Sequence, residues 1–208
     1  MKSEKKILLT AFDPFGDDKI NSALETLKNL PDEVDGARII KLQLPTVFGK
    51  SSLVVKEAIQ KEEPDAVLLL GMAGGRTMIT PERVAINVDD ARIEDNEGNR
   101  PIEQTIVPDG PAAYFSTLPI QGMVEAMLER GIPASISNTA GTFVCNHLMY
   151  FVLHYLAQNQ QNLPAGFIHL PYLPVQVLDR ANIASMGLET MVEGIGICLD
   201  VLVKNVEG

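Results

Sequence analysis

The sequence predicts an α/β protein in which helices cover both faces of a mostly parallel central sheet, a three-layer α/β/α sandwich with a protruding β-hairpin. Short apolar runs alternate with amphipathic segments of helical spacing along the chain. Residues 66–70 are apolar at every position, as a parallel strand buried on both faces requires. No linker, repeat or low-complexity tract interrupts the alternation, so residues 1–208 are expected to form one domain.

The first half of the chain supplies three of the expected strands and two helices. The strands are expected over residues 6–11, 37–42 and 66–70. The helix after the first strand is expected to start at Ser22, where Glu25 completes a capping box. The helix before the third strand is expected to be capped by Ser51 or Ser52 and to end before Pro64.

The second half continues the pattern after an irregular stretch. Residues 84–108 contain strand-like pieces and many polar residues, which indicates a β-hairpin or a protruding loop. Beyond it we expect a helix over residues 120–130 that ends at Gly131, followed by a short strand over residues 132–137. The last helix carries one apolar stripe, formed by Ile195, Cys198, Leu199 and Leu202.

Cys145 stands at the most informative point of the chain. Residues 137–147 are typical of a strand end, a tight turn of small residues and the first turn of a helix. The unpaired N–H groups at a helix N-terminus favour a thiolate, so a lowered pKa is expected for this thiol. The alternative is a small core residue, because unpaired cysteines are often buried. The glycine-containing turn favours a nucleophile.

The histidines distinguish between possible partners for this cysteine. At about 100° per residue, His147 and His154 project to the opposite side of the helix from Cys145. Nothing nearby completes a metal site with them, so both are expected to be solvated or hydrogen-bonded. His169 instead ends an apolar strand over residues 165–170. Since chemistry in open α/β sheets gathers at the carboxyl ends of strands, His169 and Cys145 are expected to meet there as base and nucleophile.

A carboxylate should orient the histidine, but spacing does not identify it. The candidates all fall in one polar stretch after the third strand: Glu82, Asp89, Asp90, Glu94 and Asp95.

Several motifs resemble the pyroglutamyl peptidase I family, also called the pyrrolidone-carboxylate peptidases. They are residues 12–16, 71–76, 82–87, 90–93, 109–119, the segment around Cys145, and 169–174. The resemblance implies a cysteine peptidase that removes N-terminal pyroglutamate (5-oxoproline) from peptides through an acyl-enzyme thioester. It implies that Cys145 is the nucleophile, His169 the base and Glu82 the orienting acid. It also implies a homotetramer.

The resemblance further implies a slot for the lactam ring. Its expected walls are Phe12, Phe15, Thr46, Ile93, Phe143 and Val144, with Asn21 as a polar contact and Arg92 beside the oxyanion. Met72 stands where the family usually carries glutamine, so the lactam could be bound there by main chain or by a side chain. Asp17 and Ser22 also depart from the family pattern.

Composition excludes several other classes of protein. The net charge of −10 disfavours binding to nucleic acid or to an anionic membrane. The start of the chain shows no signal-peptide pattern and two cysteines make no disulfide framework, so a cytoplasmic protein is expected. No metal or other cofactor is expected.

Two other functions remain open from the sequence. One is a binding or regulatory protein that keeps the fold without useful turnover. The other is a different Cys–His–Glu amidase, such as a glutaminase.

Overall fold

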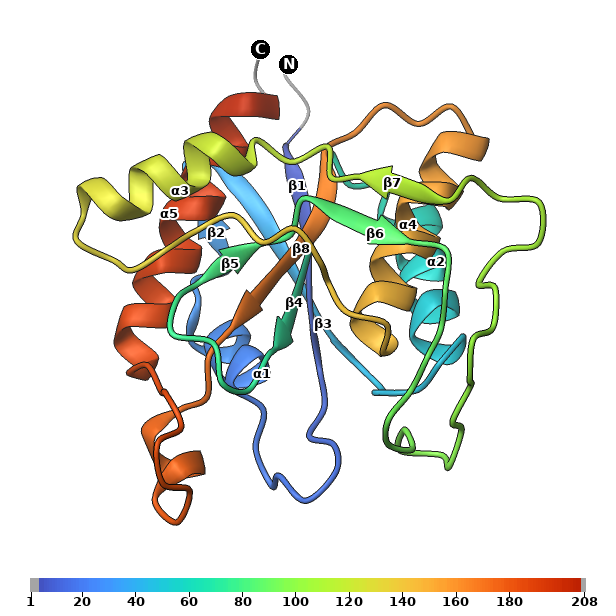
Figure 1. The fold of residues 1–208 in the computed structure, drawn as a ribbon. Coiled ribbons are helices and arrows are strands. Elements are labelled where there is room, and N and C mark those ends of the chain that lie inside the picture. Colours follow the sequence, from blue (N-terminus) through green and yellow to red (C-terminus); the bar gives the residue numbers. More distant parts are fainter. Residues whose placement is uncertain (1–3, 207–208) are drawn as a thin grey trace.

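The computed structural model describes residues 4–206, which are built around a six-stranded sheet of order β2-β3-β1-β4-β8-β5 (Figure 1). The four central strands are parallel to one another: β3 (Ala37–Leu44), β1 (Lys6–Phe12), β4 (Ala66–Met72) and β8 (Ala165–Leu170). Short antiparallel strands lie at the two edges, β2 (Glu33–Val34) and β5 (Thr80–Pro81).

Helices cover both faces of this sheet. One face packs against α1 (Ser22–Asn29), α3 (Ile120–Glu129) and α5 (Leu188–Val206). The other packs against α2 (Lys50–Glu62) and α4 (Val144–Gln158). Each face has its own apolar cluster, so the predicted three-layer sandwich is confirmed. A short 3-10 turn, η1 (Pro174–Val177), lies between β8 and α5.

The most hydrophobic elements lie where the sequence places them. Every residue of β4 is buried, because α1 covers one face of the strand and α4 the other. The apolar stripe of α5 packs on its own sheet, and all four of its residues are 0% exposed. Within it, Sγ of Cys198 lies 3.8 Å from Sδ of Met127. This cysteine therefore faces the core of its own chain.

Two helix starts differ from the prediction by one or two residues. Asn21, not Ser22, caps α1, because its Oδ1 accepts a hydrogen bond from the N–H of Ala23 at 3.0 Å. Gly49 precedes α2, so Ser51 and Ser52 lie inside the helix.

The strand expected over residues 132–137 is not continuous. Only two isolated bridges form, Ile79 with Ala134 and Glu82 with Ser137. Pro81 and Pro133 lack an N–H group, so a regular ladder cannot form between the two segments. Instead, the carbonyls of both prolines accept hydrogen bonds from the facing segment. The result is an irregular extension of the sheet beyond β5.

The hairpin has a different pairing from the one expected within residues 84–108. Strand β6 (Val84–Ile86) pairs with β7 (Ala113–Phe115), and the connection between them runs past α4 and α2 (Figure 1). The side-chain amide of Asn146 on α4 bonds both the N–H and the carbonyl of Ile86 at 2.9 Å. The hairpin is therefore covered by its own chain. None of the helices in the described part of the chain is long and apolar enough to span a membrane.

Candidate functional site

Cys145 lies in the first turn of α4, as predicted. The turn before it contains Gly141 with a φ of 77°, a conformation that glycine adopts without strain. Thr142 secures the turn, since its carbonyl accepts from the N–H of Asp90 at 2.9 Å and its hydroxyl donates to the carbonyl of Asp90 at 2.8 Å. The helix therefore begins at a fixed place, with its first N–H groups beside the thiol.

The packing of Gly71 brings the sulfur of Cys145 toward His169. A Cβ atom on Gly71 would lie only 3.1 Å from Sγ of Cys145, so the sulfur rests directly on the backbone of β4. Gly71 is the register partner of His169 in β8, and neighbouring strands lie about 4.8 Å apart. The cysteine and the histidine line the same cavity of about 510 Å³.

One of the candidate carboxylates contacts His169. Oε1 of Glu82 lies 2.6 Å from Nδ1 of His169, and Glu82 is completely buried. A carboxylate accepts, so Nδ1 carries the proton and Nε2 is left for the cavity. None of the other candidates contacts His169: Asp89 pairs with His147, Asp95 holds a tight turn, Glu94 is exposed, and Asp90 lines the cavity as an exposed residue.

Arg76 belongs to this site although the sequence predicts no role for it. Its Nη1 lies 2.7 Å from Oε1 of Glu82, the oxygen that also contacts His169. Further hydrogen bonds join the guanidinium to the hydroxyl of Thr80 and, at 3.2 Å, to the carbonyl of Thr139 in the turn before α4. The one available signal was its place directly after Gly74 and Gly75, in a turn that leaves a buried strand.

The resting charges of the pair differ from the expectation. Burial raises the pKa of the Cys145 thiol to about 12, and the charge of Glu82 adds to this, while Arg76 and a backbone hydrogen bond only partly oppose it. The predicted lowering by the helix N-terminus is therefore wrong in direction. Burial also lowers the pKa of His169, and Arg76 acts the same way, against the opposing effect of Glu82. At neutral pH the pair is a neutral thiol beside a neutral imidazole.

The expected slot residues divide into two groups. Those that line the cavity with Cys145 and His169 are Phe15, Met72, Arg92, Ile93 and Phe143.

The remaining four residues lie behind the cavity lining. Phe12 is 2% exposed and packs on the ring of Phe167, and Val144 is completely buried. The hydroxyl and N–H of Thr46 bond Asp13, and the amide of Asn21 is used by the α1 cap and the Asp13 carbonyl. These four residues support the site from behind.

The two histidines on the far side of α4, His147 and His154, were expected to be solvated or hydrogen-bonded, and both are hydrogen-bonded. Nδ1 of His147 lies 2.7 Å from Oδ2 of Asp89, and its Nε2 accepts from the N–H of Gly49. Nδ1 of His154 lies 3.0 Å from the hydroxyl of Tyr114. Across residues 4–206, no three His, Cys, Asp or Glu side chains are arranged to hold a metal ion.

A larger groove, of about 700 Å³, lies at the opposite ends of the strands. Lys5, Asp65 and Pro164 line it, and they directly precede β1, β4 and β8. Ligand sites of open α/β sheets lie at the other ends, where Cys145 and His169 are found. The smaller cavity is therefore the candidate active site.

Comparisons with known proteins point to one family. The family model described as pyroglutamyl peptidase matches residues 5–205. A pyrrolidone-carboxylate peptidase of Alkaliphilus oremlandii is 58% identical over 200 residues, which cover 96% of this chain and 94% of that protein. The crystal structure of pyroglutamyl peptidase I from Bacillus amyloliquefaciens has a TM-score of 0.93 at 46% identity and covers 97% of this chain and 98% of its own. The pyrrolidone carboxyl peptidase of Thermococcus litoralis has a TM-score of 0.94 at 36% identity, with coverages of 98% and 95%. The chain therefore belongs to the pyroglutamyl peptidase family.

Proposed function

We propose that this protein is a cysteine peptidase, formed by a single catalytic domain, that removes pyroglutamate from the N-terminus of peptides. The observation that carries the proposal is that His169, hydrogen-bonded to the buried Glu82, lines one cavity with Cys145. The sequence similarity to pyrrolidone-carboxylate peptidases supports the substrate class.

The first half of the reaction forms a thioester. Sγ of Cys145 attacks the carbonyl carbon of the pyroglutamyl residue while Nε2 of His169 takes the thiol proton. Because the resting pair is neutral, this proton moves during the attack and not before it. Glu82 stabilises the imidazolium that forms on His169. The ion pair with Arg76 partly neutralises the charge of Glu82 and so weakens its effect on the imidazole. His169 then protonates the amine nitrogen as the C–N bond breaks.

Hydrolysis of the thioester regenerates the thiol. Water attacks the acyl carbon as Nε2 of His169 accepts its proton, and the sulfur leaves and is reprotonated by the imidazolium. In both steps negative charge develops on the carbonyl oxygen. The N–H groups of the first turn of α4 are positioned to stabilise it, and Arg92 on the cavity wall adds a cation.

The cavity walls suit a neutral ring. Phe15, Ile93 and Phe143 present apolar surface to the space beside the thiol. An N-terminal glutamate or glutamine would bring a charged ammonium group against this surface, and burying an unpaired charge is costly. The pyroglutamyl lactam carries no such charge. We infer discrimination of several powers of ten in favour of the lactam.

Main-chain groups of β4 supply polar contacts for the lactam. Pairing between β1 and β4 ends at Ala11 and Leu70, so the next residues of β4 have no strand partner on that side. The N–H of Ala73 donates toward β8, and in a strand the N–H of the preceding Met72 points the other way. The thioether of Met72 contacts the amide of Gln176 and has no proton to donate.

Turnover of three chromogenic amides separates this function from the alternatives. The pure protein should release the dye from pyroglutamyl amide and leave glutaminyl and glutamyl amides nearly untouched. Comparable rates on glutaminyl amide would indicate a different amidase, and no turnover of any of them would indicate a binding protein.

A cytoplasmic homotetramer completes the proposal. Both cysteines are unpaired, which suits a reducing compartment. The tetramer is proposed from the family resemblance alone. Within one chain α4 already covers the hairpin and the apolar stripe of α5 is buried, so neither surface gives a separate argument for an interface. Light scattering on reduced, dilute protein should give several times the 22.6 kDa of one chain. A mass near 22.6 kDa would exclude the tetramer.

A further inference from the structure

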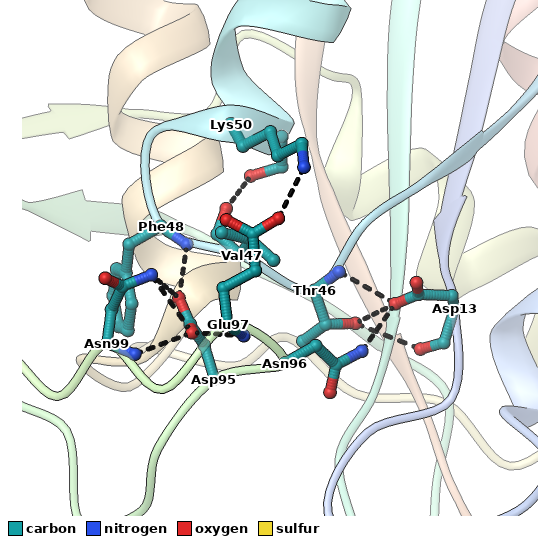
Figure 2. Close-up of polar contacts among 10 residues, drawn as sticks. Asp13, Thr46, Val47, Phe48, Lys50, Asp95, Asn96, Glu97 and Asn99 are labelled. Carbon is teal, nitrogen blue, oxygen red and sulfur yellow. Dashed lines mark hydrogen bonds and ion pairs between the residues drawn. The ribbon is translucent and has the colours of Figure 1, made fainter.

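The two apolar walls of the candidate active site come from distant parts of the chain. Phe15 follows β1, and Ile93 lies in the connection between β6 and β7. One side chain joins the two segments. Nδ2 of Asn96 donates to the carbonyl of Pro14 at 2.9 Å. It also donates to Oδ1 of Asp13 at 3.1 Å (Figure 2). Asn96, three residues after Ile93, is thus hydrogen-bonded to Pro14, the residue directly before Phe15.

Asp13 extends this junction to a third loop. Its Oδ1 also accepts from the N–H and the hydroxyl of Thr46, both at 2.7 Å (Figure 2). The backbone N–H of Asn96 in turn donates to the carbonyl of Thr46 at 3.1 Å. The loops after β1 and β3 and the turn at Asn96 are therefore fixed to one another by a closed set of hydrogen bonds.

The turn that carries Asn96 is itself rigid. The carboxylate of Asp95 accepts from the backbone N–H groups of Phe48, Glu97 and Asn99, each at 2.9 Å (Figure 2). Burial alone would raise the pKa of Asp95, but the hydrogen bonds from Asn99, Phe48 and Glu97 outweigh it and lower the pKa. The carboxylate is thus charged at neutral pH, and it holds the turn in one conformation.

We propose that Asn96 is a positioning residue that sets the width of the lactam slot by tying the Phe15 loop to the Ile93 segment. The proposal rests on the proposed function, because it names what fixes that same slot. The ring centroids of Phe15 and Phe143 are 5.9 Å apart. Phe143 also packs edge-on against Phe48, with 5.3 Å between the ring centroids. The Phe143 wall is thus held by Phe48, whereas the Phe15 and Ile93 walls are joined through Asn96.

Asn96 is exposed and is not among the residues that line the cavity with Cys145 and His169. Its loss should therefore weaken substrate binding and leave the chemical steps intact. Asn96→Ala is expected to raise KM for a pyroglutamyl amide about tenfold, with kcat within about twofold of wild type. Asn96→Asp replaces the donor with a second carboxylate beside Asp13, so its KM should rise further and should fall again as salt is added.

Glu97→Gln is the matched control. The Glu97 side chain belongs to the same turn but points to Lys50, with which it forms an exposed ion pair (Figure 2). Exposed pairs of this kind contribute little, so KM and kcat should both match wild type.

Hydrogen exchange gives a readout that does not depend on turnover. In Asn96→Ala, amide exchange should speed up in peptides that contain Phe15 and in those that contain Ile93, and should stay unchanged in Glu97→Gln. Unchanged exchange in both peptides, or a fall in kcat at constant KM, would overturn the positioning role. If wild type fails to hydrolyse the pyroglutamyl amide, the proposed function fails, while hydrogen exchange still decides whether Asn96 joins the two walls.

Discussion

The guanidinium of Arg76 and the buried carboxylate of Glu82 form an ion pair, with 2.7 Å between Nη1 and Oε1. Because the same oxygen contacts His169, this pair controls how strongly the carboxylate acts on the imidazole. Arg76 also bonds the turn before α4. Glu82, His169 and the turn before Cys145 are therefore connected through Arg76.

Removing this guanidinium should change both the rate and its pH dependence. Arg76 lowers the pKa of His169, so Arg76→Gln should raise that pKa and move the acid limb of kcat/KM to higher pH. The loosened turn should also lower kcat by about 100-fold. Arg76→Lys keeps the charge and should leave the limb closer to its wild-type position. A wild-type profile and rate in Arg76→Gln would contradict this role.

The pH profile of the wild-type enzyme follows from the neutral resting pair. His169 acts as a base only when unprotonated, and its pKa lies below the ordinary 6.5. The kcat/KM value should therefore fall on the acid side with a midpoint below pH 6.5. The thiol should add no alkaline limb near neutrality, because its pKa is about 12. An acid limb centred above pH 6.5 would contradict the lowered pKa of His169, and an alkaline limb from loss of the imidazolium proton would indicate a thiolate–imidazolium pair at rest.

Substitution of Gly71 tests the packing beneath the Cys145 thiol. A Cβ on this residue would lie 2.6 Å from the ring of Phe167 and 3.1 Å from Sγ of Cys145. Gly71→Ala should cost about 1–3 kcal/mol of unfolding free energy and slow both turnover and alkylation of the thiol. Gly196→Ala is the control, since a Cβ on that α5 glycine meets nothing within 4 Å. It should raise stability by about 0.5–1 kcal/mol with normal activity. Equal activity in the two variants would show that the thiol does not depend on close packing at Gly71.

Met72 tests how β4 contacts the lactam. If main-chain groups provide the contact, Met72→Gln should change kcat/KM by less than about threefold, because a side chain at this position adds no required hydrogen bond. Steady-state kinetics on the pyroglutamyl amide gives the answer. A gain of tenfold or more would mean that a side-chain amide binds the lactam.

The parts of the site that sequence predicts are those encoded locally. The turn before Cys145 and the apolar run that ends at His169 carry their own signals, and β4 and β8 then bring the two residues together. Glu82 has no such signal, because its position depends on residues 79–82 lying beside residues 134–137, a contact between distant segments. Arg76 is placed by its contact with Glu82, so it could not be assigned before that acid was known.

The fold shows the same division. The central strands and the helices between them follow from short periodic patterns, and their positions agree with expectation to within a few residues. The hairpin does not, because β7 lies beyond the stretch that suggested it and is selected by pairing with β6. Residues 132–137 have the composition of a strand, but Pro133 and the facing Pro81 remove two of the donors that a ladder needs.

The most direct test of the central claim is single-substrate turnover with and without the nucleophile. Wild-type protein should release pyroglutamate from a pyroglutamyl amide, lose this activity on thiol alkylation, and retain it in the presence of a metal chelator. Cys145→Ala should lower kcat by several powers of ten while its thermal unfolding stays cooperative. Undiminished turnover of the pyroglutamyl amide by Cys145→Ala would contradict the assignment of Cys145 as the nucleophile.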